Sequence, residues 1–75
     1  MDVGMLWFDN DKSRDLSSKI ARAAAYYREK YGIRPNLCFV HPTMMKNPAL
    51  GLEKIEIRPT NSMLPNHLWI GQGSM

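Results

Sequence analysis

The sequence predicts a small α/β domain, a mixed sheet of about four strands in the order strand, helix, strand, strand, strand, with one main helix on one face. An α+β arrangement is the alternative. Three observations lead there. The 75 residues suffice for one domain and one core. One long stretch has helical periodicity, and four short apolar runs surround it. All five prolines follow residue 34, so no second long helix is expected.

The first apolar run predicts a strand over about residues 4–9. Gly4 to Phe8 is too short for a buried helix and ends in a polar cluster that begins at Asp9. Both odd and even positions are apolar, so we expect cover on both faces of this strand.

The segment from Ser13 to Tyr31 is predicted to be the helix, because apolar residues recur there at steps of three and four. Ser13 or Asp11 is the expected N-cap, and Gly32 is the expected stop. The apolar stripe consists of Leu16, Ile20, Ala23, Ala24, Tyr27 and Tyr31.

Three further runs are predicted to be strands: Leu37 to Val40, Lys54 to Arg58, and His67 to Ile70. The first two strands of the chain, joined through the helix, are expected to form a parallel pair. The last two strands have no helix before them and are expected to add an antiparallel edge. Residues 71–75 are expected to form a flexible tail.

One helix covers only one face of a sheet, which leaves apolar side chains on the other face. Only the stretch from Met44 to Leu52 remains inside the chain to lie over them. We therefore expect a homodimer, formed through the second sheet face or through the edge of the last strand. Complete cover by the 44–52 loop is the alternative.

Composition narrows the functional classes. The longest apolar run, Met5 to Phe8, has four residues, whereas a membrane-spanning helix needs about 20. No signal peptide is recognised at the start, and the single cysteine, Cys38, has no partner for a disulfide within the chain. We expect a cytoplasmic protein without a membrane segment and without a cofactor.

Acidic residues after the first strand raise the question of a metal site. Asp9 and Asp11 follow that strand, and His41 ends the second. If the two strands are neighbours, these three side chains share one edge of the sheet and could hold Mg²⁺ or another divalent ion for phosphate chemistry. The alternative is that the aspartates only shape a turn and cap the helix.

A basic flank of the helix suggests nucleic-acid binding. The chain carries a formal charge of +3, and Lys19, Arg22, Tyr26 and Lys30 lie away from the apolar stripe. A solvated helix face is the alternative. No catalytic residue is assigned, because Cys38 and His41 are expected to point to opposite faces of their strand and His67, next to Asn66, is expected to form a hydrogen bond in a loop.

Three segments resemble those of a family of small bacterial proteins of unknown function over nearly the whole length. They are Leu6 to Asp11, Tyr31 to Pro42, and Leu64 to Gly71. The resemblance implies a complete small protein and brings no activity with it. The expected function is that of a cytoplasmic binding or accessory module without catalysis of its own, acting as a homodimer. Nucleic-acid association and a divalent-metal phosphate enzyme are the alternatives.

Overall fold

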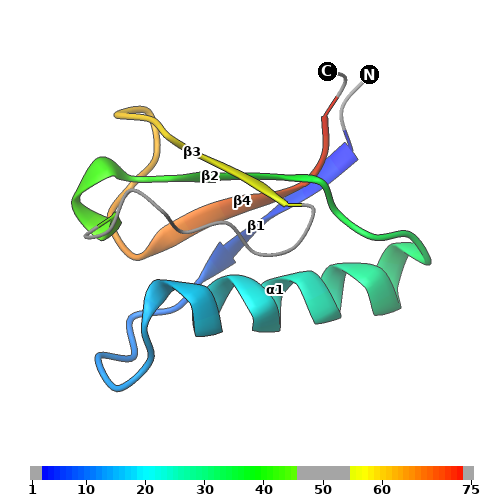
Figure 1. The fold of residues 1–75 in the computed structure, drawn as a ribbon, viewed down its shortest axis with the longest axis horizontal. Helices are drawn as coiled ribbons and strands as arrows, with labels where there is room; N and C mark the ends of the chain where they lie inside the picture. Colours follow the sequence, from blue (N-terminus) through cyan, green and yellow to red (C-terminus); the bar gives the residue numbers. More distant parts are fainter. Residues whose placement is uncertain (1–2, 46–54, 74–75) are drawn as a thin grey trace.

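Two layers make up the fold, a mixed sheet and one helix that lies across a single face of it (Figure 1). The computed structural model describes residues 3–45 and 55–73. The predicted α/β class and element order are confirmed within them. The elements are β1 (Val3–Phe8), α1 (Leu16–Tyr31), β2 (Leu37–Val40), the short 3-10 helix η1 (Pro42–Met44), β3 (Glu56–Pro59) and β4 (His67–Gln72).

The pairing of the strands differs from the expected pairing. The sheet runs β1-β4-β2-β3, with β4 antiparallel to both β1 and β2, and with β3 parallel to β2. The predicted antiparallel edge is wrong, because β4 lies inside the sheet and β3 is parallel. Strands β1 and β2 do point the same way, as a helical crossover requires, but β4 separates them. Because β4 is paired on both sides, the expected dimer through the last strand's edge is also ruled out.

The helix begins later than predicted because a different residue caps it. Asp15 is the N-cap, and its carboxylate accepts the Ser18 N–H at 2.8 Å. Asp11 and Ser13, the expected caps, belong to the preceding loop. Gly32 ends the helix as predicted, with φ at +75°, a left-handed conformation that glycine adopts without steric cost.

The core lies between α1 and the face of the sheet that α1 covers. Its buried members are Leu16, Ile20, Ala23, Tyr27, Cys38, Val40, Leu68 and Ile70. Met44, Met45 and Ile55 pack against this core, so the chain on both sides of residues 46–54 lies against the helix side of the sheet. Most of the loop expected to cover the other face, residues 46–52, lies outside the described residues.

The predicted tail is shorter than expected. Gly71 and Gln72 continue β4, and Gly71 is buried, so the prediction of a tail from residue 71 is wrong for these two residues. The side-chain oxygen of Asn36 accepts the Gly73 N–H at 2.9 Å, and the Gly71 carbonyl accepts the Asn36 N–H at 2.9 Å. Residues 74–75 lie outside the described part.

We call the side of the sheet away from α1 the open face. Side chains alternate along a strand, so those that do not join the core point to this face. The strand register places them next to one another, with Trp69 between Leu6 and Phe39. The open face consists of Leu6, Phe8, Leu37, Phe39, Glu56, Arg58, His67 and Trp69.

Candidate functional site

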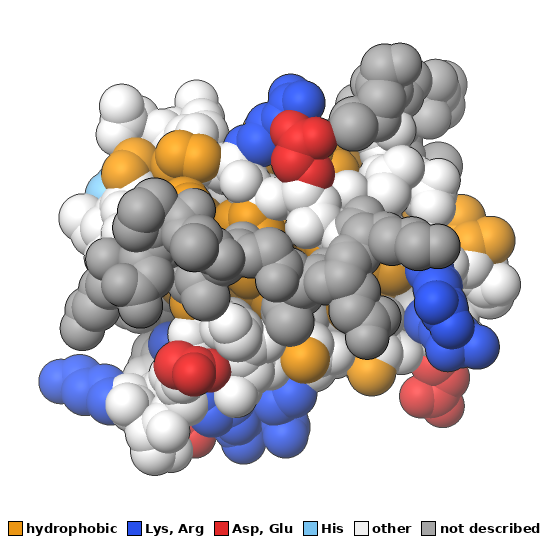
Figure 2. Space-filling model, in the orientation of Figure 1, with side chains coloured by type: hydrophobic (Ala, Val, Ile, Leu, Met, Phe, Trp, Pro, Cys, Tyr) orange, Lys and Arg blue, Asp and Glu red, His pale blue; other side chains and the backbone are white. Residues whose placement is uncertain are grey.

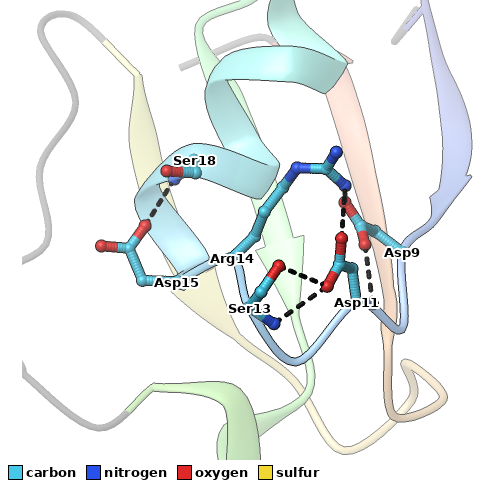
Figure 3. Close-up of polar contacts among 6 residues, drawn as sticks. All are labelled: Asp9, Asp11, Ser13, Arg14, Asp15 and Ser18. Atoms are coloured by element: carbon cyan, nitrogen blue, oxygen red, sulfur yellow. Dashed lines mark hydrogen bonds and ion pairs between the residues drawn. The ribbon is translucent and has the colours of Figure 1, made fainter.

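The acidic turn after β1 is held together by its own hydrogen bonds (Figure 3). Asp9 is almost completely buried and accepts the Asp11 N–H at 2.9 Å. Asp11 in turn accepts the Ser13 N–H at 2.9 Å and the Ser13 hydroxyl at 2.7 Å. One guanidinium nitrogen of Arg14 lies 3.4 Å from Asp9 and 3.2 Å from Asp11. The turn therefore brings the carboxylates of Asp9 and Asp11 together around the guanidinium group of Arg14.

The electrostatics of this turn disfavour an added metal ion. The two Ser13 hydrogen bonds are the main reason why the pKa of the Asp11 carboxyl lies below its ordinary value, and Arg14 adds to the effect. Asp11 is thus a charged group whose oxygens already have partners. A divalent cation would have to displace the Arg14 guanidinium and the Ser13 donors to reach both carboxylates.

His41 does not join the two aspartates. Its Nδ1 lies 2.7 Å from the Thr43 hydroxyl and accepts the Thr43 N–H at 3.2 Å, so it caps η1. It follows β2, whereas Asp9 follows β1, and β4 lies between these strands. Across residues 3–45 and 55–73, no group of three His, Cys, Asp or Glu side chains is placed to hold a metal ion.

The predicted basic flank of α1 is only partly presented to solvent. Lys19 is 8% exposed and so lies mostly under its neighbours, contrary to expectation. Arg22, Tyr26 and Lys30 are exposed and follow one another at steps of four along the helix. The Tyr26 ring packs 5.3 Å from the Trp7 ring, and the Lys30 Nζ lies 5.5 Å from the centre of the Tyr31 ring. Figure 2 shows blue Lys and Arg side chains gathered low in the view, around α1.

Neither of the other two candidates for chemistry is set up for catalysis. Cys38 is fully buried in the core, and this burial raises the pKa of its thiol to about 12, so the thiolate nucleophile does not form near neutral pH. The His67 ring packs 4.8 Å from the Phe8 ring, and its Nδ1 lies 2.9 Å from the Pro65 carbonyl. Cys38 therefore belongs to the core, and His67 packs against neighbouring residues of the sheet.

A hollow of about 630 Å³ lies beside the second half of α1. Ala24 and Ala25 form part of its wall, and Arg28 and Arg34 add two guanidinium groups. Ile55 also lines the hollow, and it directly follows residues that the structure does not describe. This hollow therefore supports no assignment of a ligand.

The open face carries the largest exposed apolar side chains in the sheet. Leu6 is 62% exposed and Phe8 is 56% exposed, both on β1. Towards the middle of the sheet the exposure falls, because Trp69 and Phe39 are half-buried and their ring centres lie 5.7 Å apart. Leu37 is buried. Apolar exposure on this face is therefore concentrated on the edge strand β1.

The sequence predicted a sheet face without helix cover that carries roughly alternate residues of Gly4–Phe8 and Leu37–Val40, together with Trp69, but not which of the alternating residues lie on it. The signal was present in the alternation of Leu6 and Phe8 with Met5 and Trp7, which divides β1 into a core face and an open face. Both sets are apolar, so the sequence pattern alone did not show which set meets the helix.

Comparison of the chain with protein-family models, curated proteins and solved structures found no match. Within the described residues, no helix combines the length and the apolar character needed to cross a bilayer.

Proposed function

We propose that the protein is a small binding module without catalysis of its own, and that it acts as a homodimer in which the second copy covers apolar surface of the sheet. The observation that supports this proposal is the exposure of Leu6 and Phe8 on the open face. Large apolar side chains scattered singly on a surface are common, but these two are adjacent on the same face of one strand, beside Trp69 and His67.

Because the chain is small, covering its exposed apolar side chains would contribute a large share of its folding free energy. Burying a Leu or Phe side chain completely contributes about 1.5–3 kcal/mol, so covering the exposed half of two such side chains contributes roughly that amount per copy. A chain of this size buries only about 60% of its unfolded surface, and folded domains are stable by only about 5–15 kcal/mol. Association would therefore supply a substantial part of the stability.

The charge distribution favours a second copy over a nucleic acid on this face. Its one carboxylate, Glu56, and its one guanidinium, Arg58, form an ion pair with each other. The exposed cations Arg22 and Lys30 lie on α1, on the other side of the sheet. A nucleic-acid surface combines aromatic side chains with cations, and the open face supplies the aromatic side chains without a net positive charge.

Light scattering at high micromolar protein concentration tests the proposal. We expect twice the 8.6 kDa mass of one chain. A monomeric mass together with a cooperative thermal transition would overturn it, because the folded protein would then leave the open face uncovered even at a concentration that favours association.

The single buried cysteine and the resemblance to bacterial proteins support a cytoplasmic setting in a bacterium.

Nucleic-acid binding through α1 is the second candidate, supported by the ridge of Arg22, Tyr26 and Lys30. Tyr26 is half exposed between two cations, an arrangement that allows phosphate contact and base stacking together. Binding of a single-stranded oligonucleotide should then weaken steeply with salt and be reduced in an Arg22→Ala variant. Binding that is absent at low salt would rule this candidate out.

A further inference from the structure

The two edge strands of the sheet differ in how they are protected from pairing with another strand. Natural sheets protect their edges with charged side chains, proline or short strands. The edge strand β3 has all three, with the Glu56–Arg58 ion pair, Pro59 and a length of four residues. The edge strand β1 has six residues and contains neither a charged residue nor a proline. Within the described residues, no strand pairs with its outer edge.

The hydrogen-bonding groups at the outer edge of β1 follow from the register. The Asp9 N–H donates to the Asn66 carbonyl at 2.9 Å and so continues the β1–β4 ladder by one residue. Backbone groups of successive residues in a strand point to opposite sides, so Met5 and Trp7 also face β4. The N–H and C=O groups of Gly4, Leu6 and Phe8 therefore point outward.

The same reasoning shows how little β3 offers at the opposite edge. The Glu56 and Thr60 N–H groups donate to the Asn36 and Val40 carbonyls of the β2 side, at 2.9 and 2.8 Å. Ile57 and Pro59 consequently face outward, and proline has no N–H. The outer edge of β3 thus presents one donor, at Ile57, whereas the outer edge of β1 presents donors at Gly4, Leu6 and Phe8.

We propose that the second copy binds at this edge, through antiparallel pairing of β1 with β1 of the second copy about a two-fold axis at Leu6. This inference rests on the proposed homodimer and gives it a geometry. Leu6 lies opposite Leu6 of the second copy, and Gly4 lies opposite Phe8 of the second copy. The two four-stranded sheets then form one continuous sheet, with both helices on one side and both open faces on the other.

A second copy fits this edge for three reasons. The pairing is self-complementary, because the outward-facing donors and acceptors are centred on Leu6 and meet their own equivalents across the axis. The strand has no charged residue, so two copies do not repel one another. Gly4 has no side chain, and the Trp69 ring lies across it, so Phe8 of the second copy would meet an aromatic surface there.

The pairing also covers the surface that is most exposed. Leu6 and Phe8 are the most exposed apolar side chains of the open face and lie on the strand whose backbone is unpaired. Side chains on adjacent antiparallel strands lie about 4.5–5.5 Å apart, close enough for each copy to cover those of the other. One contact thus accounts for both the unprotected edge and the exposed side chains.

Amide hydrogen exchange measured by NMR as a function of protein concentration tests the inference. We expect slow exchange at the Leu6 and Phe8 amides at concentrations where the protein is dimeric, and fast exchange on dilution. The Ile57 amide is the internal control, because it points outward at the opposite edge and should exchange quickly at every concentration. A dimer in which the Leu6 and Phe8 amides exchange as fast as that of Ile57 would overturn the edge pairing and leave the homodimer intact.

Two matched variants extend the test. Leu6→Lys places a charge at the two-fold axis, whereas Leu64→Lys makes the same change at a loop leucine of similar exposure, 65% against 62%. We expect the Leu6 variant to be a folded monomer by circular dichroism and light scattering, and the Leu64 variant to remain dimeric. A dimeric Leu6→Lys variant would overturn the edge geometry, whereas a monomeric wild type would overturn both the geometry and the proposed function.

Discussion

Gly4 lies beneath the Trp69 ring, and replacing this glycine by alanine should destabilise the domain. A Cβ at position 4 would lie closer than 3.0 Å to the Cζ2, Cε2 and Cη2 atoms of that ring, a separation that real Cβ atoms essentially never show. The backbone of β1 cannot retreat easily, because β4 is hydrogen-bonded to it along its whole length. The ring of Trp69 must therefore move.

The size of the effect can be worked out from two opposing contributions. Forcing an extra methyl group into a packed site costs about 1–3 kcal/mol. Here the displaced ring also loses part of its contact with Phe39, whose ring centre lies 5.7 Å away. Alanine restricts the unfolded chain and thereby returns about 0.4–1 kcal/mol. We expect a net loss of about 1–2 kcal/mol in the free energy of unfolding.

A double-mutant cycle separates these contributions. In a Trp69→Ala background the obstacle is gone, so Gly4→Ala should change sign and stabilise the protein by about 0.4–1 kcal/mol. Urea denaturation of the four proteins at one low protein concentration, where association does not enter, gives the free energies. If Gly4→Ala changes the stability equally in both backgrounds, within about 0.5 kcal/mol, the proposed contact with Trp69 is refuted.

Three further outcomes follow from the core, the thiol and the helix cap. Leu68 is fully buried, so Leu68→Ala should lower the free energy of unfolding by about 2–5 kcal/mol. Leu64 is 65% exposed, so Leu64→Ala should change it by less than about 0.5 kcal/mol. Equal urea midpoints for the two variants would contradict the assignment of Leu68 to the core. Burial raises the pKa of the Cys38 thiol to about 12, so Ellman's reagent at pH 8 should react slowly with the native protein and quickly with the protein unfolded in concentrated urea. Fast labelling of the native protein would contradict this burial. Asp15→Ala should lower the Tm at pH 7. The Ser18 N–H lowers the pKa of the Asp15 carboxyl below its ordinary 3.8, so this stabilisation is present above that value and disappears as the pH falls through the lower, folded-state pKa. A Tm difference that persists at pH 2 would contradict the role of the charged cap.

The helix and the strands could be predicted from the sequence, because residues close together in the chain determine where each of them forms. The periodic apolar residues from Leu16 to Tyr27 and the left-handed Gly32 define the helix with no information from the rest of the chain. The short apolar runs define the strands in the same way. The N-cap was mistaken because Asp11, Ser13 and Asp15 are all good caps, and only the hydrogen bond to Ser18 distinguishes Asp15.

The strand order could not be predicted, because it depends on contacts between residues far apart in the sequence. A helical crossover sets the direction of the two strands it joins but allows another strand to lie between them. In this protein Met5 pairs with Ile70, and Cys38 pairs with the same residue from the other side. The expected grouping of His41 with Asp9 and Asp11 depended on neighbouring strands and failed for that reason.

The burial of Lys19 shows a second limit of pattern reasoning. The residue follows Leu16 by three positions and precedes Ile20, so it lies next to the apolar stripe. A long aliphatic stem can lie on apolar neighbours, and the charge of Lys19 contributes to lowering the pKa of the Asp11 carboxyl. The shortage of covering helix led to the expectation of an open face, but its exposed edge strand could be identified only after the strand order was known.

The position of β4 has a consequence for how the chain assembles during synthesis. Of the four strands, the one that leaves the ribosome last is the one that joins the other three. Until it emerges, β1 lacks its strand partner among residues 3–45 and 55–73, and the parallel β2–β3 pair is the strand pairing of this part that can already form. A chain cut before His67 therefore lacks the central strand of the sheet together with Leu68 and Ile70, on which α1 packs, and complete folding must wait for these long-range contacts.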